Sequence, residues 1–259
     1  MGAKLGQHFL KDPAALEAIV VACGAGPGVP VLEIGPGAGA LTRPLLAAGA
    51  RVTAVELDDE LAAALPARVG ALAAGLTVLN EDFLRVDLTG LGPGPWRAAG
   101  NLPYAVATPI LQKLLPWEGW TTAALMFQKE VALRVAAEHG GADYGLLALS
   151  VRMRAEAELV LELPPSAFSP RPKVDSAVVV LRRRPACLIA PEDEPNFWRL
   201  ARTAFGQRRK MAAGTIARAL GLPRARVDEA LAEAGARADA RPEEIAFESW
   251  AALARLLRA

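Results

Sequence analysis

The stretch from residue 31 to residue 39 most constrains how this chain can fold, because an apolar run passes directly into a glycine-rich turn. Residues 31–34 have the length of a short buried strand, and a helical pattern begins near Leu41. Glycines at a strand-to-helix junction let the backbone approach a bound nucleoside closely. The spacing is Gly-x-Gly-x-Gly rather than the dinucleotide fingerprint, yet Ala40 stands where that fingerprint allows its third small residue. The turn predicts a nucleoside cofactor, and its spacing alone leaves NAD open.

Strand and helix patterns alternate over residues 30–137, which predicts parallel βαβ units. Polar residues follow the predicted strands: Glu56 ends the second, Asp82 follows the third, and Asn101 follows another apolar run. The carboxyl ends of parallel strands meet at one edge of the sheet, where such folds bind ligands. We therefore expect an α/β, Rossmann-like sheet that carries its site at this edge.

Three carboxylates are candidates for holding the cofactor. Glu56 is placed to accept both ribose hydroxyls of a nucleoside, although it would also serve as a cap for the helix that starts near Asp58. Glu33 lies inside an aliphatic strand, where an unpaired carboxylate is costly to bury, so it should contact turn amides or a cationic ligand. Asp82, with Phe83 beside it, is placed to accept from an adenine amine.

The Asn-Leu-Pro-Tyr motif at residues 101–104 has the groups needed to hold an adenine by its exocyclic amine. Two acceptors, the Asn101 oxygen and the Leu102 carbonyl, would favour a pyramidal nitrogen whose lone pair faces an electrophile. Pro103 fixes φ and donates no hydrogen bond, and Tyr104 would stack on the base. The alternative is an ordinary turn at the end of a strand, since Asn and Pro are common in turns.

The sheet pattern closes with two strand-like runs, residues 157–163 and 174–181, joined by a short proline-rich segment. So short a connection predicts an antiparallel pair. Phe168 on this segment is either a displayed base-stacking platform or a hydrophobic plug that holds the loop down. The periodicity then becomes wholly helical, which divides the chain into a sheet domain, residues 1–185, and a small helical domain, residues 186–259.

The charge is unevenly distributed. Residues 182–226 hold 11 Lys/Arg against 3 Asp/Glu, a local charge of +8 on a chain whose net charge is +1. Such a block is typical of a surface that contacts nucleic-acid phosphates, although solvated helix faces would have the same composition.

The remaining composition excludes some classes of protein. No apolar run reaches 18 residues and no signal-peptide pattern opens the chain, so we expect a cytoplasmic protein without a membrane span. Cys23 and Cys187 lack metal-ligand spacing, and no metal site is expected.

The motifs together resemble the KsgA-type family of ribosomal RNA adenine dimethyltransferases, which is related to the Erm methylases. The match runs from Gly6 to about Leu220. It rests on residues 6–10 (Gly-Gln-His-Phe-Leu), 33–39 (Glu-Ile-Gly-Pro-Gly-Ala-Gly), Glu56, 81–82 (Glu-Asp), 101–104, 128–131 (Gln-Lys-Glu-Val), 168–176 (Phe-Ser-Pro-Arg-Pro-Lys-Val-Asp-Ser) and 204–210 (Ala-Phe-Gly-Gln-Arg-Arg-Lys). Leu rather than Ile at position 102 is more similar to the small-subunit enzymes than to the Erm type.

The resemblance implies a methyltransferase that uses S-adenosylmethionine and no metal. It would convert two adjacent adenosines near the 3′ end of small-subunit (16S) rRNA to N(6),N(6)-dimethyladenosine, acting as a monomer on a pre-assembled small subunit. The implied cofactor residues are Gln7, His8, Leu10, Glu33, Gly35, Gly37, Gly39, Glu56, Leu57, Asp82, Phe83 and Asn101. The implied catalytic residues are Asn101, Leu102, Pro103, Tyr104 and Phe168, with Arg208, Arg209 and Lys210 on RNA.

The chain departs from the bacterial pattern at positions that the resemblance places on the RNA-facing rim. His8 replaces the commoner Asn, residues 140–143 replace a Pro-Gly loop, and Met211-Ala212-Ala213 follows the basic motif where Thr-Leu is usual. Three alternatives stay open: an Erm-like large-subunit methylase, a ribosome assembly factor with incidental catalysis, and an NAD-dependent oxidoreductase.

Overall fold

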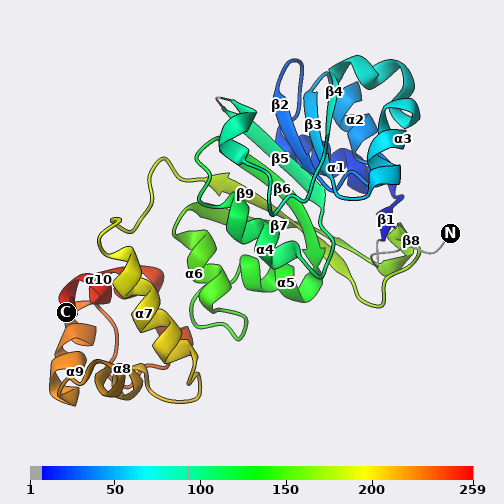
Figure 1. Ribbon diagram of the computed structural model, residues 1–259. Coiled ribbons are helices and arrows are strands. Elements are labelled where there is room, and N and C mark those ends of the chain that lie inside the picture. Colours follow the sequence, from blue (N-terminus) through cyan, green and yellow to red (C-terminus); the bar gives the residue numbers. More distant parts are fainter. Residues whose placement is uncertain (1–7, 93, 259) are drawn as a thin grey trace. The chain divides into compact units, whose positions relative to one another are not determined.

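A computed structural model describes residues 8–92 and 94–258 and contains a seven-stranded sheet (Figure 1). From one edge to the other, the strands are β4 (Leu76–Asn80), β3 (Arg51–Glu56), β2 (Pro30–Ile34), β5 (Trp96–Asn101), β6 (Trp120–Gln128), β9 (Ser176–Arg183) and β7 (Ala155–Leu163). The first five are parallel, and β9 is antiparallel to both of its neighbours. The predicted parallel units and the predicted antiparallel pair are both confirmed.

The order of the strands determines where a ligand can enter the sheet. Along the chain, the first strand of this sheet is β2. The next two strands, β3 and β4, are added on one side of β2, and β5 then pairs with β2 on its other side. The direction of winding therefore reverses between β2 and β5, and open α/β sheets bind ligands outside the strand ends at such a reversal. The glycine turn follows β2 and the Asn-Leu-Pro-Tyr motif follows β5, so both lie at this point.

Helices and short 3₁₀ turns connect the strands. The α-helices of this part of the chain are α1 (Pro13–Cys23), α2 (Thr42–Ala47), α3 (Asp59–Val69), α4 (Ala107–Leu114) and α5 (Lys129–Val135), and the 3₁₀ turns are η1 (Gly70–Gly75), η2 (Leu88–Leu91) and η3 (Pro165–Ala167). Helix α1 begins as its sequence dictates: the Asp12 carboxylate accepts from the amides of Ala14 and Ala15, and Pro13 occupies the first turn. The helix then packs on β5 and β6.

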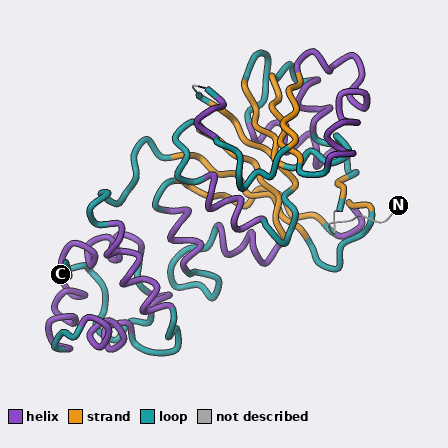
Figure 2. The backbone as a smooth tube through the Cα atoms, viewed as in Figure 1, coloured by secondary structure: helices purple, strands orange, loops and turns teal. Residues whose placement is uncertain are grey.

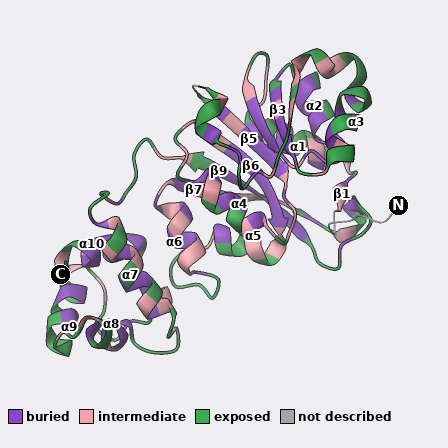
Figure 3. Ribbon diagram, viewed as in Figure 1, coloured by how far each residue is buried: buried purple, intermediate pink, exposed green. Residues whose placement is uncertain are grey.

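A second, two-stranded sheet joins the start of the described chain to the segment before β9. Strand β1 (Phe9–Leu10) pairs antiparallel with β8 (Phe168–Ser169), and the Lys11 amide donates to the Ala167 carbonyl at 2.9 Å. Leu10 and Phe168 are buried in the same core cluster as Ile19 of α1. Figure 3 shows the inner strands of the main sheet as largely buried, whereas the edge strands β4 and β7 are mostly intermediate or exposed.

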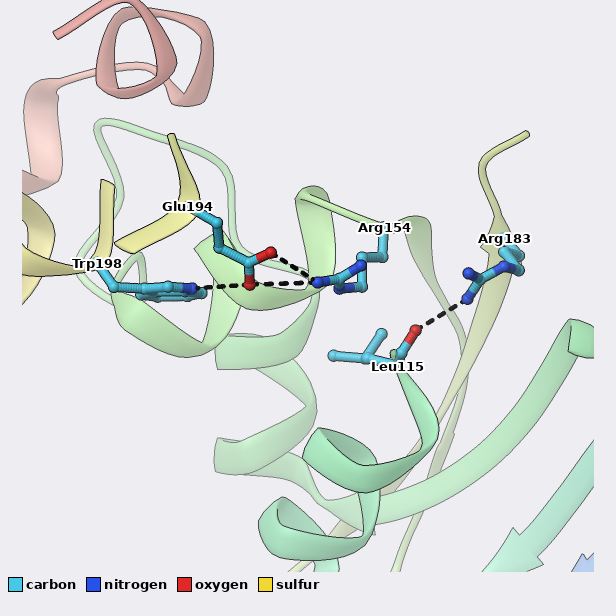
Figure 4. A network of polar contacts seen from close by, with 5 residues as sticks. All are labelled: Leu115, Arg154, Arg183, Glu194 and Trp198. Atoms are coloured by element: carbon cyan, nitrogen blue, oxygen red, sulfur yellow. Dashed lines mark hydrogen bonds and ion pairs between the residues drawn. The ribbon is translucent and has the colours of Figure 1, made fainter. Parts of the chain in front are cut away.

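The chain forms two compact units, and the sheet unit holds the described residues up to Leu133 together with Ala155–Arg183. Within the sheet unit, Arg183 at the end of β9 donates to the Leu115 carbonyl at 2.9 Å (Figure 4). The helical unit holds Arg134–Arg154 and the residues from Arg184 onward, drawn mainly as helix and loop in Figure 2. Its helices are α6 (Leu146–Arg152), α7 (Glu194–Phe205), α8 (Ala212–Leu220), α9 (Arg224–Glu233), η4 (Pro242–Glu244) and α10 (Phe247–Leu256).

Residues 134–154 belong to the helical unit because their apolar side chains complete its core. Tyr144 is buried with its ring 6.3 Å from that of Phe205, and Leu149 lies in the same cluster as Phe197. Arg154 donates to both oxygens of Glu194, at 3.0 and 3.2 Å, as Figure 4 shows. These contacts cross the sequence boundary drawn at residue 185, and the division into a sheet domain and a helical domain at that residue stays a prediction.

Candidate functional site

A pocket lies at the reversal point, at the carboxyl edge of the sheet, and we call it the carboxyl-edge pocket. Its walls come from β1, α1, the glycine turn, the tip of β3 and the Asn-Leu-Pro-Tyr motif. Ten of the residues predicted to bind cofactor or to act in catalysis line it: His8, Leu10, Glu33, Gly35, Gly37, Glu56, Asn101, Leu102, Pro103 and Tyr104. Gln7 lies outside the described residues. Gly39, Leu57, Asp82, Phe83 and Phe168 do not line the pocket.

The glycine turn is a conformation that side chains would oppose. Gly35, Gly37 and Gly39 all have positive φ, at 69°, 56° and 87°. A Cβ at Gly37 would lie 2.7 Å from Cε1 of Phe9, and one at Gly39 would lie 2.9 Å from Cδ1 of Leu65. The first contact lies at the pocket wall and the second packs the turn on α3. The backbone angle therefore disfavours a side chain at all three glycines, and close contacts add to this at Gly37 and Gly39.

Glu56 ties this turn to the neighbouring strand. The carboxylate is buried, with Oε2 accepting from the Gly37 amide at 2.9 Å and Oε1 accepting from the Asp58 amide at 3.0 Å. Asp58 itself caps α3 by accepting from the amides of Glu60 and Leu61. A carboxylate has about four lone-pair positions, so each Glu56 oxygen keeps capacity for a further donor.

Among the described residues that line the pocket, Glu33 is the carboxylate with an oxygen that has no hydrogen-bond partner. It is 1% exposed, and its Oε2 atom has no hydrogen-bond partner among the described residues. Burial raises the pKa of Glu33 to about 8, against a smaller opposing effect of Thr42 and with a further rise caused by Glu56. An orphaned acidic group in a pocket is a receptor for a cation or for a donor group.

Separate segments hold the two polar side chains of the Asn-Leu-Pro-Tyr motif. Asn101 Nδ2 donates to the His8 carbonyl at 2.7 Å, and the Tyr104 hydroxyl bonds to Ser176 Oγ at 2.7 Å. Burial raises the pKa of Tyr104, against an opposing effect of Ser176, so the phenol stays neutral and available as a hydrogen-bonding group. Leu102 is buried, with its amide donating to the Met126 carbonyl of β6 at 3.3 Å.

The residues predicted to hold the cofactor adenine lie beyond the pocket lining, after β4. Asp82 Oδ1 accepts from the Leu84 amide at 2.9 Å, and Phe83 is buried. Lys113 of α4 covers this loop: its Nζ lies 5.7 Å from the centroid of the Phe83 ring and donates to the Val86 carbonyl at 2.6 Å. Lys113 could not be predicted from the sequence, because a single lysine on an amphipathic helix carries no signal of a partner 27 residues away.

The prediction that Phe168 is displayed for base stacking is wrong in this structure, and the plug alternative holds. Phe168 is 0% exposed and packs in the core with Leu10 and Ile19, because β1 pairs over β8. Ser176, the partner of Tyr104, was also missed as a site residue. Its signals were its place as the last residue of the 168–176 motif and its hydroxyl at the start of an apolar strand.

The basic motif of the helical unit divides into two kinds of side chain. Arg208 donates to the carbonyls of Gly141 and Ala142 and lies 3.6 Å from a Glu243 oxygen, so it holds a loop of its own unit. Arg209 and Lys210 are exposed. RNA contact by all three stays a prediction, and the geometry favours Arg209 and Lys210 for it.

Comparison with known proteins decides the family. The model of the family described as "Ribosomal RNA adenine dimethylase" matches residues 2–257. The chain belongs to this family.

Relatives agree with this family assignment. "Ribosomal RNA small subunit methyltransferase A" of Desulfitobacterium hafniense (strain DSM 10664 / DCB-2) is 40% identical over 253 residues, covering 96% of this chain and 89% of the relative. The protein of the same name from Dinoroseobacter shibae is 43% identical over 260 residues, covering 98% and 91%.

Two solved structures share the fold over nearly the whole chain. The 23S rRNA methyltransferase ErmE has a TM-score of 0.77 at 31% identity, covering 96% of this chain and 99% of that structure. A dimethyladenosine transferase from Plasmodium falciparum has a TM-score of 0.80 at 25% identity, covering 95% and 96%. This family member is therefore an S-adenosylmethionine-dependent rRNA adenine methyltransferase, as the resemblance predicted, and the nicotinamide alternative falls away.

The residues that line the pocket have the chemistry needed to bind the family's cofactor. S-Adenosylmethionine carries a cationic ammonium group, and the orphaned Glu33 oxygen lies in the pocket wall. The described residues contain no group of three His, Cys, Asp or Glu placed to hold a metal ion, and the absence of a metal requirement stays a prediction. Within the same described part of the chain, no helix combines the length and hydropathy that a membrane crossing needs.

Proposed function

We propose that this enzyme dimethylates N(6) of two adjacent adenosines near the 3′ end of small-subunit rRNA, within a pre-assembled small subunit. One observation carries the proposal: the orphaned Glu33 carboxylate, the glycine turn and the Asn-Leu-Pro-Tyr motif line one pocket. The names of the relatives, which specify the small subunit, support this choice of RNA.

The half of the pocket built by β2 and β3 holds the cofactor. Glu33 receives the cationic ammonium group, the backbone of Gly35 and Gly37 lies against the ligand, and Glu56 accepts from the ribose hydroxyls. When bound, S-adenosylmethionine supplies a methyl group activated by its positively charged sulfur. Asp82 would accept from the adenine amine beyond the pocket lining.

The Asn-Leu-Pro-Tyr motif holds the amine that receives the methyl group. The Asn101 oxygen and the Leu102 carbonyl accept its two hydrogens, which directs the nitrogen lone pair away from both acceptors. The same two acceptors stabilise the positive charge that develops on the amine during transfer. The attacking amine is neutral, so the step needs positioning and charge stabilisation rather than a strong general base. Because the Asn101 side chain is bonded to His8, we assign any contact of Asn101 with the cofactor to its backbone.

Tyr104 provides the face on which the target base stacks. The adenosine must leave its own stack to enter the pocket, which costs on the order of a few kcal/mol and is offset by stacking on the tyrosine. Ser176 holds the Tyr104 hydroxyl, so the ring is fixed before the base arrives. The buried Phe168 supports this arrangement from β8, which pairs with β1, rather than by contact with the base.

Labelled methyl transfer to undermethylated small subunits, large subunits and protein-free rRNA, followed by nucleoside analysis, tests the proposal. We expect dimethyladenosine in small-subunit rRNA only. Label in large-subunit rRNA would favour an Erm-like enzyme, a candidate supported by the match to ErmE. Cofactor binding without label in any RNA would favour an assembly factor with incidental catalysis.

A further inference from the structure

The side-chain amide of Asn101 has one defined orientation, and a backbone carbonyl defines it. The two ends of a primary amide are similar in size, so packing alone does not choose between them. The Asn101 atom that faces the His8 carbonyl lies 2.7 Å from its oxygen. A carbonyl oxygen only accepts hydrogen bonds, so the facing atom must be the nitrogen. The amide oxygen therefore faces away from that carbonyl and can accept a hydrogen bond from another donor.

His8 is itself held by a remote segment. Its Nδ1 atom lies 2.8 Å from the Pro170 carbonyl, and since that carbonyl can only accept, Nδ1 carries the hydrogen. The imidazole ring lies 5.6 Å from the Tyr104 ring, with an angle of 32° between their planes. Pairing of Phe9 with Ser169 continues the attachment along β1 and β8. One residue thus contacts both polar side chains of the Asn-Leu-Pro-Tyr motif.

We propose that His8 is a positioning residue for methyl transfer. Anchored by Pro170, it presents its carbonyl to Asn101 and so fixes the amide with the nitrogen toward residue 8, which leaves the oxygen for the substrate amine. In the opposite orientation, an amide N–H would meet the N–H of the substrate, and the acceptor that orients the lone pair would be lost. This inference rests on the proposed function, because it needs an amine as the group that Asn101 receives.

Substitution of His8 should therefore lower kcat without weakening cofactor binding. In the His8→Ala variant the Pro170 contact is lost and residue 8 is free to shift, so we expect kcat to fall about 3- to 10-fold, the value of one hydrogen bond. The affinity for S-adenosylhomocysteine should stay near the wild-type value, because the His8 side chain bonds to Pro170 and the proposed function gives it no contact with the cofactor. The melting temperature should fall only by the value of the lost hydrogen bond. The His8→Asn variant should recover most of the turnover, because an asparagine amide can also donate to the Pro170 carbonyl.

A spectroscopic measurement distinguishes positioning from a general structural role. In a ¹H–¹⁵N spectrum, the side-chain amide of Asn101 is assigned by its disappearance in Asn101→Ala. We expect one of its two protons to be protected from exchange in the wild type and in His8→Asn, and to lose protection in His8→Ala. Lys11→Ala is the matched control, since this exposed side chain lies on the same segment and only its backbone takes part in the pairing.

The outcomes separate this inference from the proposed function. If His8→Ala keeps both wild-type kcat and the protected amide proton, or if it changes only the melting temperature, His8 does not position Asn101. If instead Asn101→Ala retains wild-type turnover, the assignment of Asn101 as the amine acceptor fails, and the positioning role fails with it. Loss of turnover in Asn101→Ala together with normal turnover in His8→Ala would overturn the inference alone.

Discussion

The two halves of the carboxyl-edge pocket are built in different ways. In the half that would hold the cofactor, Glu56 bonds to Gly37 only 19 residues away, and the turn, strand and cap follow one another along the chain. In the half that would hold the target base, Asn101 bonds to His8 across 93 residues and Tyr104 bonds to Ser176 across 72. The first half is a product of local sequence, whereas the second exists only after the whole sheet unit has folded.

This difference predicts that the two halves fail separately. Changes in the local half should weaken cofactor binding, since that half holds the ligand directly. Changes in the half built from distant segments should lower turnover and leave the cofactor bound. The protein should therefore be able to lose methyl transfer without losing its cofactor.

The largest effect is expected for Asn101→Ala, which removes the side-chain acceptor of the amine. We expect kcat to fall about 100-fold or more, the scale seen when one transition-state hydrogen bond is deleted. Steady-state kinetics on undermethylated small subunits measure it. Asn80→Ala is the matched control, because its amide donates to the Glu56 carbonyl in the other half and should alter the KM for the cofactor instead. Equal losses of kcat in both variants would remove the distinction between the halves.

Gly37→Ala should be next in size, and it tests the local half. A residue at φ 56° stores about 1–3 kcal/mol of strain, and the added Cβ would also meet the Phe9 ring. We expect both lower stability in denaturant and weaker cofactor binding.

Gly28→Ala separates the two causes by which Gly37→Ala could weaken cofactor binding, namely backbone strain and the contact with Phe9. Gly28 has a similar φ of 74° but open space around its Cβ position, so it carries the strain without the contact. Equal losses of cofactor affinity in the two variants would show that the contact between Gly37 and Phe9 has no role in the pocket.

Glu33→Gln keeps the shape of the side chain and removes its charge. In the ligand-free protein the pKa of Glu33 lies at about 8 against an ordinary 4.5. Between these pH values the unfolded chain releases a proton that the folded protein retains, so stability falls as the pH rises from 4.5 to 8. Denaturation at several pH values should show that this fall is absent in Glu33→Gln.

Cofactor binding gives the second measurement on Glu33. A ligand's ammonium group beside Glu33 favours the ionised carboxylate, so binding of S-adenosylhomocysteine at pH 7 should release a proton from the wild type and none from Glu33→Gln. Calorimetry in two buffers that differ in ionisation enthalpy measures this release. Identical proton release from both proteins would exclude Glu33 as the ammonium receptor.

The smallest effect is expected for Lys113→Met, which uncovers the loop after β4. The variant loses the hydrogen bond to the Val86 carbonyl and the contact with the Phe83 ring but keeps an apolar stem. We expect the KM for the cofactor to rise about threefold, the value of one net hydrogen bond, with kcat unchanged. Lys11→Met, an exposed lysine elsewhere, should leave both constants unchanged.

Features of the fold and of the site that depend on residues close together in the chain could be predicted from the sequence. The glycine turn, the carboxylates of the first two strands and the parallel sheet followed from spacing and periodicity, because each is fixed by contacts within one βαβ unit. The edge of the sheet that carries both Asn101 and Glu33 followed in turn from the parallel order of the strands.

Contacts between segments that lie far apart in the sequence could not be predicted from it. Phe168 was expected to be a displayed ring as readily as a plug, and only the pairing of β1 with β8 buries it. The proline-rich segment that contains Phe168 has no sequence pattern that predicts its pairing with Phe9–Leu10. The loop contact of Arg208 and the packing of Tyr144 with the C-terminal helices are of the same kind.

Calorimetric titration of S-adenosylhomocysteine into Asn101→Ala and Glu33→Gln, beside the wild type, tests the division of the pocket most directly. The predicted result is that Asn101→Ala binds S-adenosylhomocysteine with wild-type affinity although its methyl transfer is strongly slowed. Glu33→Gln should bind S-adenosylhomocysteine more weakly. Loss of cofactor binding in Asn101→Ala in proportion to its loss of turnover would contradict the account, as would unchanged affinity in Glu33→Gln.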